Sequence, residues 1–191
     1  RPGRPSPRGD GLTTVTQLIP AVVRRLERLP KGLRDHVERS RNVAREFAER
    51  YGVCRDRIDI AMAAHDLARS LRPKALLAQA DHLNLDVHPV EARTPILLHG
   101  PIAARWLENE NGVDDKQILE AVHYHTTGRR GMSKLAKIVF LADKLDPHKV
   151  ANKGHMKRVA ELATDSLDAA LLEYIDQALM HILDQGALVH P

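Results

Sequence analysis

The chain has 191 residues, of which 43% are hydrophobic and 3% are aromatic, and its formal net charge is +4. This length supports one sizeable hydrophobic core and is short for two complete domains. The basic balance would suit a nucleic-acid partner, but the distribution of the charge along the chain argues against one.

Most of the excess positive charge lies near the N-terminus. Residues 1–34 hold eight lysines and arginines against two acidic residues, whereas residues 35–191 hold 21 against 23. Residues 1–11 are rich in proline, glycine and arginine, which is typical of a solvated linker. We therefore predict a basic tail or linker with a short helix in residues 1–32, and one domain in residues 33–191. Nucleic-acid contact through the tail is the less favoured alternative.

The location of the protein is predicted from its apolar runs and its cysteine content. No apolar run approaches the roughly 18 residues of a membrane-spanning helix, and no signal-peptide pattern follows the first residues. Cys54 is the single cysteine, which excludes a disulfide within the chain and a CxxC zinc site. We expect a cytoplasmic protein without membrane contact, in which Cys54 is partly buried.

Composition and apolar periodicity predict an all-α fold built of short helices. Alanine, leucine, arginine, glutamate and lysine dominate, and apolar side chains recur at i+3 and i+4 between capping signals. The expected helices span residues 20–29, 33–51, 56–68, 73–80, 96–110, 114–124, 134–145, 155–163 and 167–184. Residues 81–95 are predicted to form a polar connection in which His82 and His88 are exposed.

The dipeptide His65–Asp66 follows a run of apolar residues at positions 60–64. Adjacent helix positions point about 100° apart, so the two side chains can hold one cation from two sides, or the carboxylate can bridge two cations. Arg69, three residues further on, can reach the same site. The ordinary alternative is a core histidine beside a helix-terminal aspartate.

Two other candidates lie on the apolar faces of expected helices. His36 belongs to the apolar stripe of residues 33–51. Asp143 borders the apolar stripe of residues 134–145, where a carboxylate needs a cation or several hydrogen-bond donors. The alternatives are a satisfied core histidine and a salt bridge from Asp143 to Lys144 or Lys149.

Further histidines adjoin a turn that is suited to phosphate. His99 precedes Gly100–Pro101, a helix-opening signal, and His125 follows the helix of residues 114–124. The turn at residues 126–131 offers hydroxyl, backbone N–H and guanidinium groups, which suit phosphate oxygens. A solvated capping turn is the alternative. Taken together, imidazole and carboxylate groups without cysteine suit Fe²⁺, Mn²⁺ or Zn²⁺ with an open position for water.

The order His36, His65–Asp66 and Asp143 resembles that of the HD-domain metal-dependent phosphohydrolases, an all-α family of helical bundles in which these residues hold a metal ion. Three segments are similar to the YqeK branch of this family: LLHGPIAA (97–104), AVHYHTTGRRGMSKLAKIVFLADKLDP (121–147) and LVHP (188–191). That branch cleaves diadenosine tetraphosphate symmetrically to two molecules of ADP. The resemblance covers residues 33–191.

The resemblance implies a set of site residues. The metal ligands would be His36, His65, Asp66 and Asp143, with Asp66 also acting on the attacking water. His99 and His125 would contact phosphate or complete a second metal site. Substrate contacts are implied or expected for Thr126, Lys149, Arg69, Arg129 and His190. The metal implied is Fe²⁺, with Mn²⁺ or another divalent metal as alternatives, in a site of one or two ions. Asp146 and Lys149 stand where the family usually has a glutamate and an arginine.

The partners implied are a dinucleoside polyphosphate and, from the family alone, a second copy of the chain. One alternative keeps the fold and changes the substrate to (p)ppGpp, a dNTP or a cyclic dinucleotide. Another alternative is a binding module for a nucleotide or RNA that has no catalytic activity.

Overall fold

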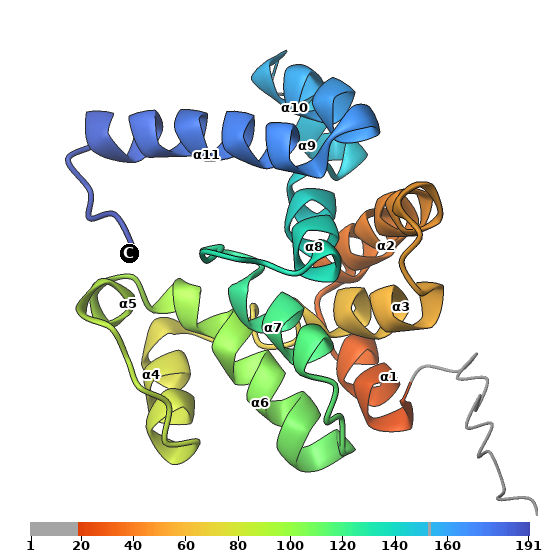
Figure 1. Cartoon of the computed structure of the whole chain (residues 1–191). Helices are drawn as coiled ribbons and strands as arrows, with labels where there is room; N and C mark the ends of the chain where they lie inside the picture. The colour runs from red at the N-terminus through yellow and green to blue at the C-terminus, as the bar shows by residue number, and fades with distance from the viewer. Residues whose placement is uncertain (1–18, 153) are drawn as a thin grey trace, which may run out of the picture.

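The computed structural model describes residues 19–152 and 154–191, and these contain eleven α-helices, one 3₁₀-helix and no strand (Figure 1). The helices are α1 (Pro20–Glu27), α2 (Lys31–Tyr51), α3 (Arg55–Ala64), α4 (Pro73–His82), α5 (Pro89–Arg93), η1 (Pro95–Leu98), α6 (His99–Asn111), α7 (Lys116–Tyr124), α8 (Lys134–Lys144), α9 (Pro147–Asn152), α10 (Gly154–Asp165) and α11 (Leu167–Asp184). The predicted all-α fold is confirmed. The linker predicted for residues 1–11 lies outside the described residues.

Helix α8 lies at the centre of the molecule. It packs against α2, α7 and α11, and eight of its eleven residues are buried. Its lysines are not buried, but its apolar residues cover most of its surface, as is typical of an interior helix. Ile138 and Phe140 accordingly contribute to the core with Ile58 and Met62 of α3. The central position of α8 carries Asp143, near its C-terminal end, into the interior.

Side-chain caps and glycines set several helix ends where the sequence predicts them. Ser133 Oγ accepts a hydrogen bond from Ala136 N at the start of α8, as N-terminal serine caps do. Gly52 and Gly112 end α2 and α6 with φ of +66° and +65°, a backbone conformation that glycine adopts without steric cost.

The region between α4 and α6 is more ordered than the predicted polar connection. His88 Nδ1 accepts a hydrogen bond from Val90 N, and Glu91 Oε2 accepts one from His88 N, so the two side chains cap α5 reciprocally. His82 is exposed as expected, whereas His88 is half-buried. The prediction that His88 is exposed was wrong because the capping interaction holds it against the chain.

Three further expectations differ from the structure. Helix α3 ends at Ala64, so His65 and Asp66 lie in the turns that follow it and not within the helix. Residues 147–152 form a helix, α9, that was not expected, and Asp146 Oδ1 accepts a hydrogen bond from His148 N at its start. Cys54 is exposed, not partly buried.

Helix α11 and the chain end extend along the side of the molecule that carries the turn at residues 126–131. Figure 1 shows α11 running past this turn, and the C-terminal segment then returns to lie beside α5. There the ring of His190 is 5.2 Å from the ring of His88. Among the described helices, none combines the length and the apolar character that a transbilayer segment requires.

Asp115 caps the N-terminus of α7, and its removal tests how much this cap stabilises the protein. Its carboxylate accepts hydrogen bonds from Gln117 N, Ile118 N and Arg57 Nη2. Burial alone would raise the pKa of Asp115, but these donors outweigh burial and lower it. We expect Asp115→Ala to lower the free energy of unfolding by about 1 kcal/mol at pH 7, measured by urea denaturation.

The pH dependence has a definite sign. A carboxyl group whose pKa is lowered by folding stabilises the protein above its unfolded pKa of about 3.9 and loses that contribution as the pH falls. The difference in free energy of unfolding between wild type and Asp115→Ala should therefore shrink below about pH 4. Asp114→Ala, at the exposed neighbouring position, is the control. If this difference in free energy of unfolding were equal at pH 3 and pH 7, the charge of the Asp115 carboxylate would not contribute to stability.

Candidate active site

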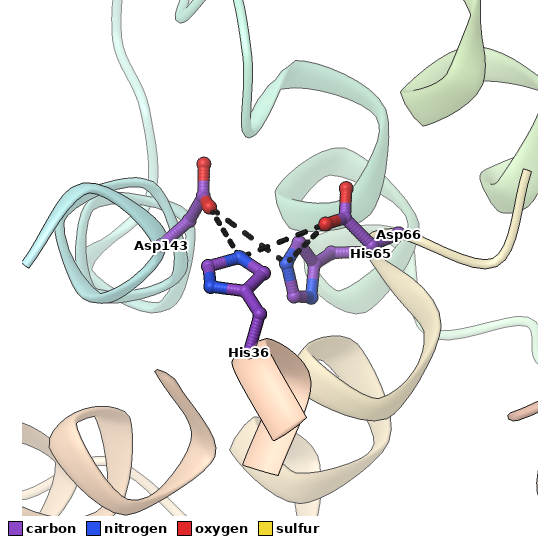
Figure 2. A group of neighbouring side chains, drawn as sticks. All are labelled: His36, His65, Asp66 and Asp143. Carbon is purple, nitrogen blue, oxygen red and sulfur yellow. Dashed lines mark hydrogen bonds and ion pairs between the residues drawn. The ribbon is translucent and has the colours of Figure 1, made fainter. Parts of the chain in front are cut away.

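Four buried side chains converge from three parts of the chain to form what we call the His/Asp cluster (Figure 2). Its members are His36 of α2, His65 and Asp66 after α3, and Asp143 of α8. Each residue offers one ligand atom, and these atoms all lie within 4.8 Å of one another. The structure thus brings together the four residues for which the resemblance implies metal binding.

The distances within the His/Asp cluster suit a single divalent ion. His36 Nε2 is 2.9 Å from Asp143 Oδ1 and 3.6 Å from Asp66 Oδ2. His65 Nε2 is 3.6 Å from Asp66 Oδ2 and 4.0 Å from Asp143 Oδ1. An ion held about 2.1 Å from each ligand separates the ligand atoms by about 3 to 4.2 Å. The four atoms therefore need little rearrangement to share one ion.

Hydrogen bonds at the outer nitrogens turn both histidine rings toward the cluster. His65 Nδ1 lies 2.7 Å from the carbonyl oxygen of Met62, so this nitrogen carries the proton and donates it. His36 Nδ1 lies 2.6 Å from Asp146 Oδ2. Such partners leave the lone pair on Nε2, which faces the other members of the cluster, as is usual for metal-binding histidines.

Unpaired buried atoms provide a test of whether a cation fits this cluster. Within the described part of the chain, His65 Nε2 and both carboxylate oxygens of Asp66 are buried and have no hydrogen-bond partner. Each unpaired buried polar atom costs about 1 to 3 kcal/mol. Three of them at one place, two of them on a carboxylate, indicate a site for a cation. The donor set fits Fe²⁺, Mn²⁺ or Zn²⁺.

A second group of ligand atoms shares Asp66. His99 Nε2 and His125 Nε2 lie 3.1 and 3.7 Å from Asp66 Oδ1, and 2.9 Å from each other. The Nδ1 atoms of these rings face the carbonyl oxygens of Ile96 and Val122, so both Nε2 atoms present lone pairs in the neutral rings. Two facing lone pairs at this distance require a proton or a cation between them.

The two carboxyl groups are held in their ionised form. Burial alone would raise the pKa of Asp66, but the neighbouring imidazoles, foremost His65, hold it well below its usual range. Burial also opposes ionisation of Asp143, yet the adjacent ammonium group of Lys144 and the other nearby donors hold its pKa well below its usual range. Both groups are thus available as anionic ligands at neutral pH.

Burial has the dominant effect on two of the imidazoles. It lowers the pKa of His65, and it lowers the pKa of His125 to about 3. At His36 burial alone would lower the pKa, but the acceptor carboxylates of Asp143 and Asp146 beside the two ring nitrogens outweigh burial and raise it. His65 and His125 are therefore neutral at pH 7, which is the form that binds metal.

Three cationic side chains surround a cavity of about 260 Å³ that opens beside Asp143. Arg69 Nη1 is 3.6 Å from Asp66 Oδ1, and Lys149 Nζ is 2.9 Å from Asp143 Oδ1. Lys144 Nζ donates to Asp143 Oδ2 and to the carbonyl oxygen of His125. Both salt bridges considered for Asp143 are thus present, and they place cations at the wall of a cavity suited to anions.

Thr126 joins this cavity to the second group of ligand atoms. The residue lines the cavity, and its Oγ1 is 3.1 Å from His125 Nε2 and 3.4 Å from His99 Nε2. The apolar side chains of Met156 and Tyr174, from α10 and α11, form another part of the wall. The cavity thus offers cations, a hydroxyl group and an apolar surface.

Sequence reasoning missed the role of three residues. Asp146 is 2% exposed and binds the Arg39 guanidinium with both oxygens, at 2.7 and 2.9 Å, in addition to His36. Arg39 lies 107 positions before Asp146, and no local pattern connects the two. Lys144 was considered only as a salt-bridge partner, although its place next to Asp143 was a usable signal.

Arg129 and His190 lie away from the His/Asp cluster. The Arg129 guanidinium is 5.2 Å from the centre of the Tyr124 ring and 3.7 Å from Glu120. His190 Nε2 is 3.6 Å from Glu91 Oε1, beside α5. A role for either residue in substrate binding requires a ligand that extends well beyond the cluster.

This all-α bundle with buried histidine and aspartate side chains is an HD domain. The HD domain family model matches residues 33–148, and the chain belongs to this family. Two similar proteins carry the name symmetrical bis(5′-nucleosyl)-tetraphosphatase. The one from Bacillus subtilis is 34% identical over 78% of this chain and 79% of its own length. The one from Staphylococcus aureus is 27% identical over 86% of this chain and 84% of its own length.

A solved structure is similar as well. The crystal structure of a predicted HD superfamily hydrolase involved in NAD metabolism, from Clostridium acetobutylicum, matches with a TM-score of 0.83 and 26% identity. The match covers 89% of both chains. The match therefore extends past residue 148, where the segment matched by the family model ends.

Gly100 allows α6 to approach α7 closely enough for His99 to meet His125. A Cβ atom at this position would lie 2.6 Å from the carbonyl oxygen of His123 and 3.1 Å from His125 Nδ1. We expect Gly100→Ala to lower the free energy of unfolding by about 1 to 3 kcal/mol because the helices must move apart. Urea denaturation measures this loss.

Gly32→Ala is the matched control. A Cβ atom at Gly32, in α2, would meet nothing within 4 Å, and alanine in a helix is favoured over glycine by about 0.5 to 1 kcal/mol. This variant should be as stable as wild type or more so. Equal stability of Gly100→Ala and Gly32→Ala would contradict the close approach of α6 and α7.

Proposed function

We propose that the protein is a metal-dependent hydrolase that cleaves diadenosine tetraphosphate between its two central phosphates, giving two molecules of ADP. The observation that carries this proposal is the buried carboxylate of Asp66, which lies between two groups of imidazoles with its oxygens unpaired in the described structure. The cavity with cationic walls beside it is suited to a polyphosphate. Membership of the HD domain family and the names of the similar proteins support the same reaction.

We propose that His36, His65, Asp66 and Asp143 hold the principal metal ion, and that Fe²⁺ is its identity. Two histidines with carboxylates and no thiolate are favourable to Fe²⁺, and Mn²⁺ suits the same donors. A second ion would be held by Asp66, His99 and His125.

A bound divalent cation supplies Lewis acidity, which lowers the pKa of a water molecule and polarises a phosphoryl oxygen. Asp66 orients the attacking water and accepts its proton. The water oxygen forms a bond to one central phosphorus, and the bond from that phosphorus to the oxygen bridging the central phosphates breaks. The bridging oxygen leaves with the other ADP.

The cationic residues of the cavity stabilise the charge of the transition state. Arg69, Lys144 and Lys149 neutralise negative charge that spreads over the phosphoryl oxygens. The Thr126 hydroxyl donates a hydrogen bond to the same group of oxygens. The apolar surface of Met156 and Tyr174 is available to one adenosine.

We infer a cytoplasmic homodimer from two surface features. The free thiol of Cys54 is exposed, which suits a reducing compartment. Several large apolar side chains of α11, among them Leu172, Met180 and Leu183, are also exposed. A second copy that covers this face would remove them from water.

The reaction is tested by anion-exchange analysis of the products formed from diadenosine tetraphosphate under anaerobic conditions with Fe²⁺ or Mn²⁺. We expect ADP as the sole product. In Asp66→Ala we expect turnover to fall by about 100-fold or more, because the metal would lose a ligand and the attacking water would lose the group that orients it. AMP with ATP would reject the symmetrical cut. Near-normal turnover by Asp66→Ala would reject the site, and the absence of turnover would redirect the search to (p)ppGpp, dNTPs and cyclic dinucleotides.

The contact between Asp146 and His36 yields a separate prediction about metal affinity. We expect Asp146→Asn to weaken binding of Fe²⁺ or Mn²⁺ by about 10- to 100-fold, since carboxylate partners of ligating histidines orient the ring and raise its basicity. Competition with a chelator measures the affinity. Asp35→Asn is the control, because Asp35 adjoins His36 in the sequence but pairs with Lys31, at 2.6 Å. Equal affinities in the two variants would show that Asp146 does not support the metal site.

A further inference from the structure

A second cavity, of about 310 Å³, lies between α6 and α7, on a different side of these helices from the His/Asp cluster. Arg105, Lys116 and Arg129 are among the residues that line it, with the aromatic rings of His123 and Tyr124. Its volume is at the lower end of the roughly 300 to 1,000 Å³ found for ligand pockets. The cavity is therefore large enough for a nucleoside.

The lining of this cavity has the chemistry of a nucleotide site. The His123 and Tyr124 rings lie 4.2 Å apart between centres, and the Arg129 guanidinium lies over the Tyr124 ring. Aromatic rings and guanidinium planes bind nucleobases by stacking. The three cations outnumber the two carboxylates in the lining, Glu108 and Glu120, which leaves positive charge for phosphate.

Only a few residues separate this cavity from the reaction site. On α6, His99 faces Asp66, whereas Pro101 and Ala104 line the cavity. On the turn after α7, Thr126 faces the first cavity and Arg129 lines the second. Thr126 and Arg129 are three positions apart, so the chain between them spans at most about 11 Å. A diphosphate with its ribose can reach across this distance.

We propose that the cavity between α6 and α7 is the subsite for the second adenosine diphosphate half of a dinucleoside polyphosphate. This proposal rests on the proposed function. A cut between the central phosphates yields two equal halves that extend from the His/Asp cluster in different directions, so the enzyme needs two nucleoside subsites. The cavity beside Asp143 receives one half, with Met156 and Tyr174 at its apolar surface. The cavity between α6 and α7 receives the other half.

The first test measures how many ADP molecules the metal-loaded protein binds, by isothermal titration calorimetry. We expect two ADP molecules per chain in the wild type, and a loss of affinity at one of the two sites by about tenfold in Arg105→Ala. Lys116→Ala should act in the same direction. Lys116 is the first residue of α7, where a cation is unfavourable to the helix dipole, so this variant keeps the fold. One ADP per chain in the wild type, or unchanged binding in both variants, would overturn the proposal.

Arg158→Ala is the matched control. Arg158 pairs with Glu161 three residues later on α10, as Arg105 pairs with Glu108 on α6. Both pairs are exposed, but the residues that line the cavity include Arg105 and not Arg158. Arg158→Ala should bind two ADP molecules with wild-type affinity, and a loss equal to that of Arg105→Ala would overturn the assignment.

The second test compares diadenosine tetraphosphate with adenosine 5′-tetraphosphate, which has one nucleoside. In Arg105→Ala we expect the ratio of kcat/KM for the first substrate to kcat/KM for the second to fall about tenfold, mainly through KM. An unchanged ratio would overturn the proposal. Failure of the proposed function is a different result, because it appears as absence of ADP formation by the wild type, while the number of ADP molecules bound still reports on the cavity.

Discussion

The burial of the Asp66 carboxylate is the constraint on which the rest of the site depends. A carboxylate without water or hydrogen-bond donors is strongly destabilising unless positive charge compensates it. In the described structure its two oxygens face different pairs of imidazoles, with His36 and His65 on one side and His99 and His125 on the other. The protein thus surrounds this anion with imidazole nitrogens and a second carboxylate, a set of groups that could hold a cation.

A repeated local arrangement orients three of the imidazoles. His65, His99 and His125 each lie at the end of a helix or of a 3₁₀ turn, and each places Nδ1 against the carbonyl oxygen three residues earlier. The last carbonyls of a helix lack partners within the helix, so the ring satisfies one of them and at the same time fixes its own tautomer. His36 lies within a helix, and its outer nitrogen binds Asp146 instead. Because His36 uses a carboxylate in place of a carbonyl oxygen, Asp146 is buried, and its charge is compensated by Arg39.

The turn at residues 126–131 lies between the two buried histidines and the cavity between α6 and α7. Thr126 touches the two histidines that share Asp66, while Arg129 lies over Tyr124 at the cavity between α6 and α7. Cations are distributed on both sides of this turn, with Arg69, Lys144 and Lys149 on one side. An elongated anion with a nucleoside at each end matches this distribution better than a compact nucleotide does.

The sequence by itself determined the helical class, most helix ends and the burial of the candidate site residues. Apolar spacing placed His36 on an inner face, and the apolar run before His65 placed that residue in the interior, because helical periodicity and burial are local properties. The resemblance then identified which polar residues lie together. Helix α9 and the capped helix α5 were not predicted, since a proline and a histidine cap are ambiguous without their contacts.

Only the tertiary structure decided which groups meet across long separations. The pairing of His36 and Arg39 with Asp146, the approach of α6 to α7 at Gly100, and the cavity that contains Arg105 and Arg129 all join segments distant in sequence or depend on the angle between helices. A period of 3.6 residues fixes the face on which a side chain lies. It does not fix the neighbour that this face meets, because that choice depends on how whole helices pack.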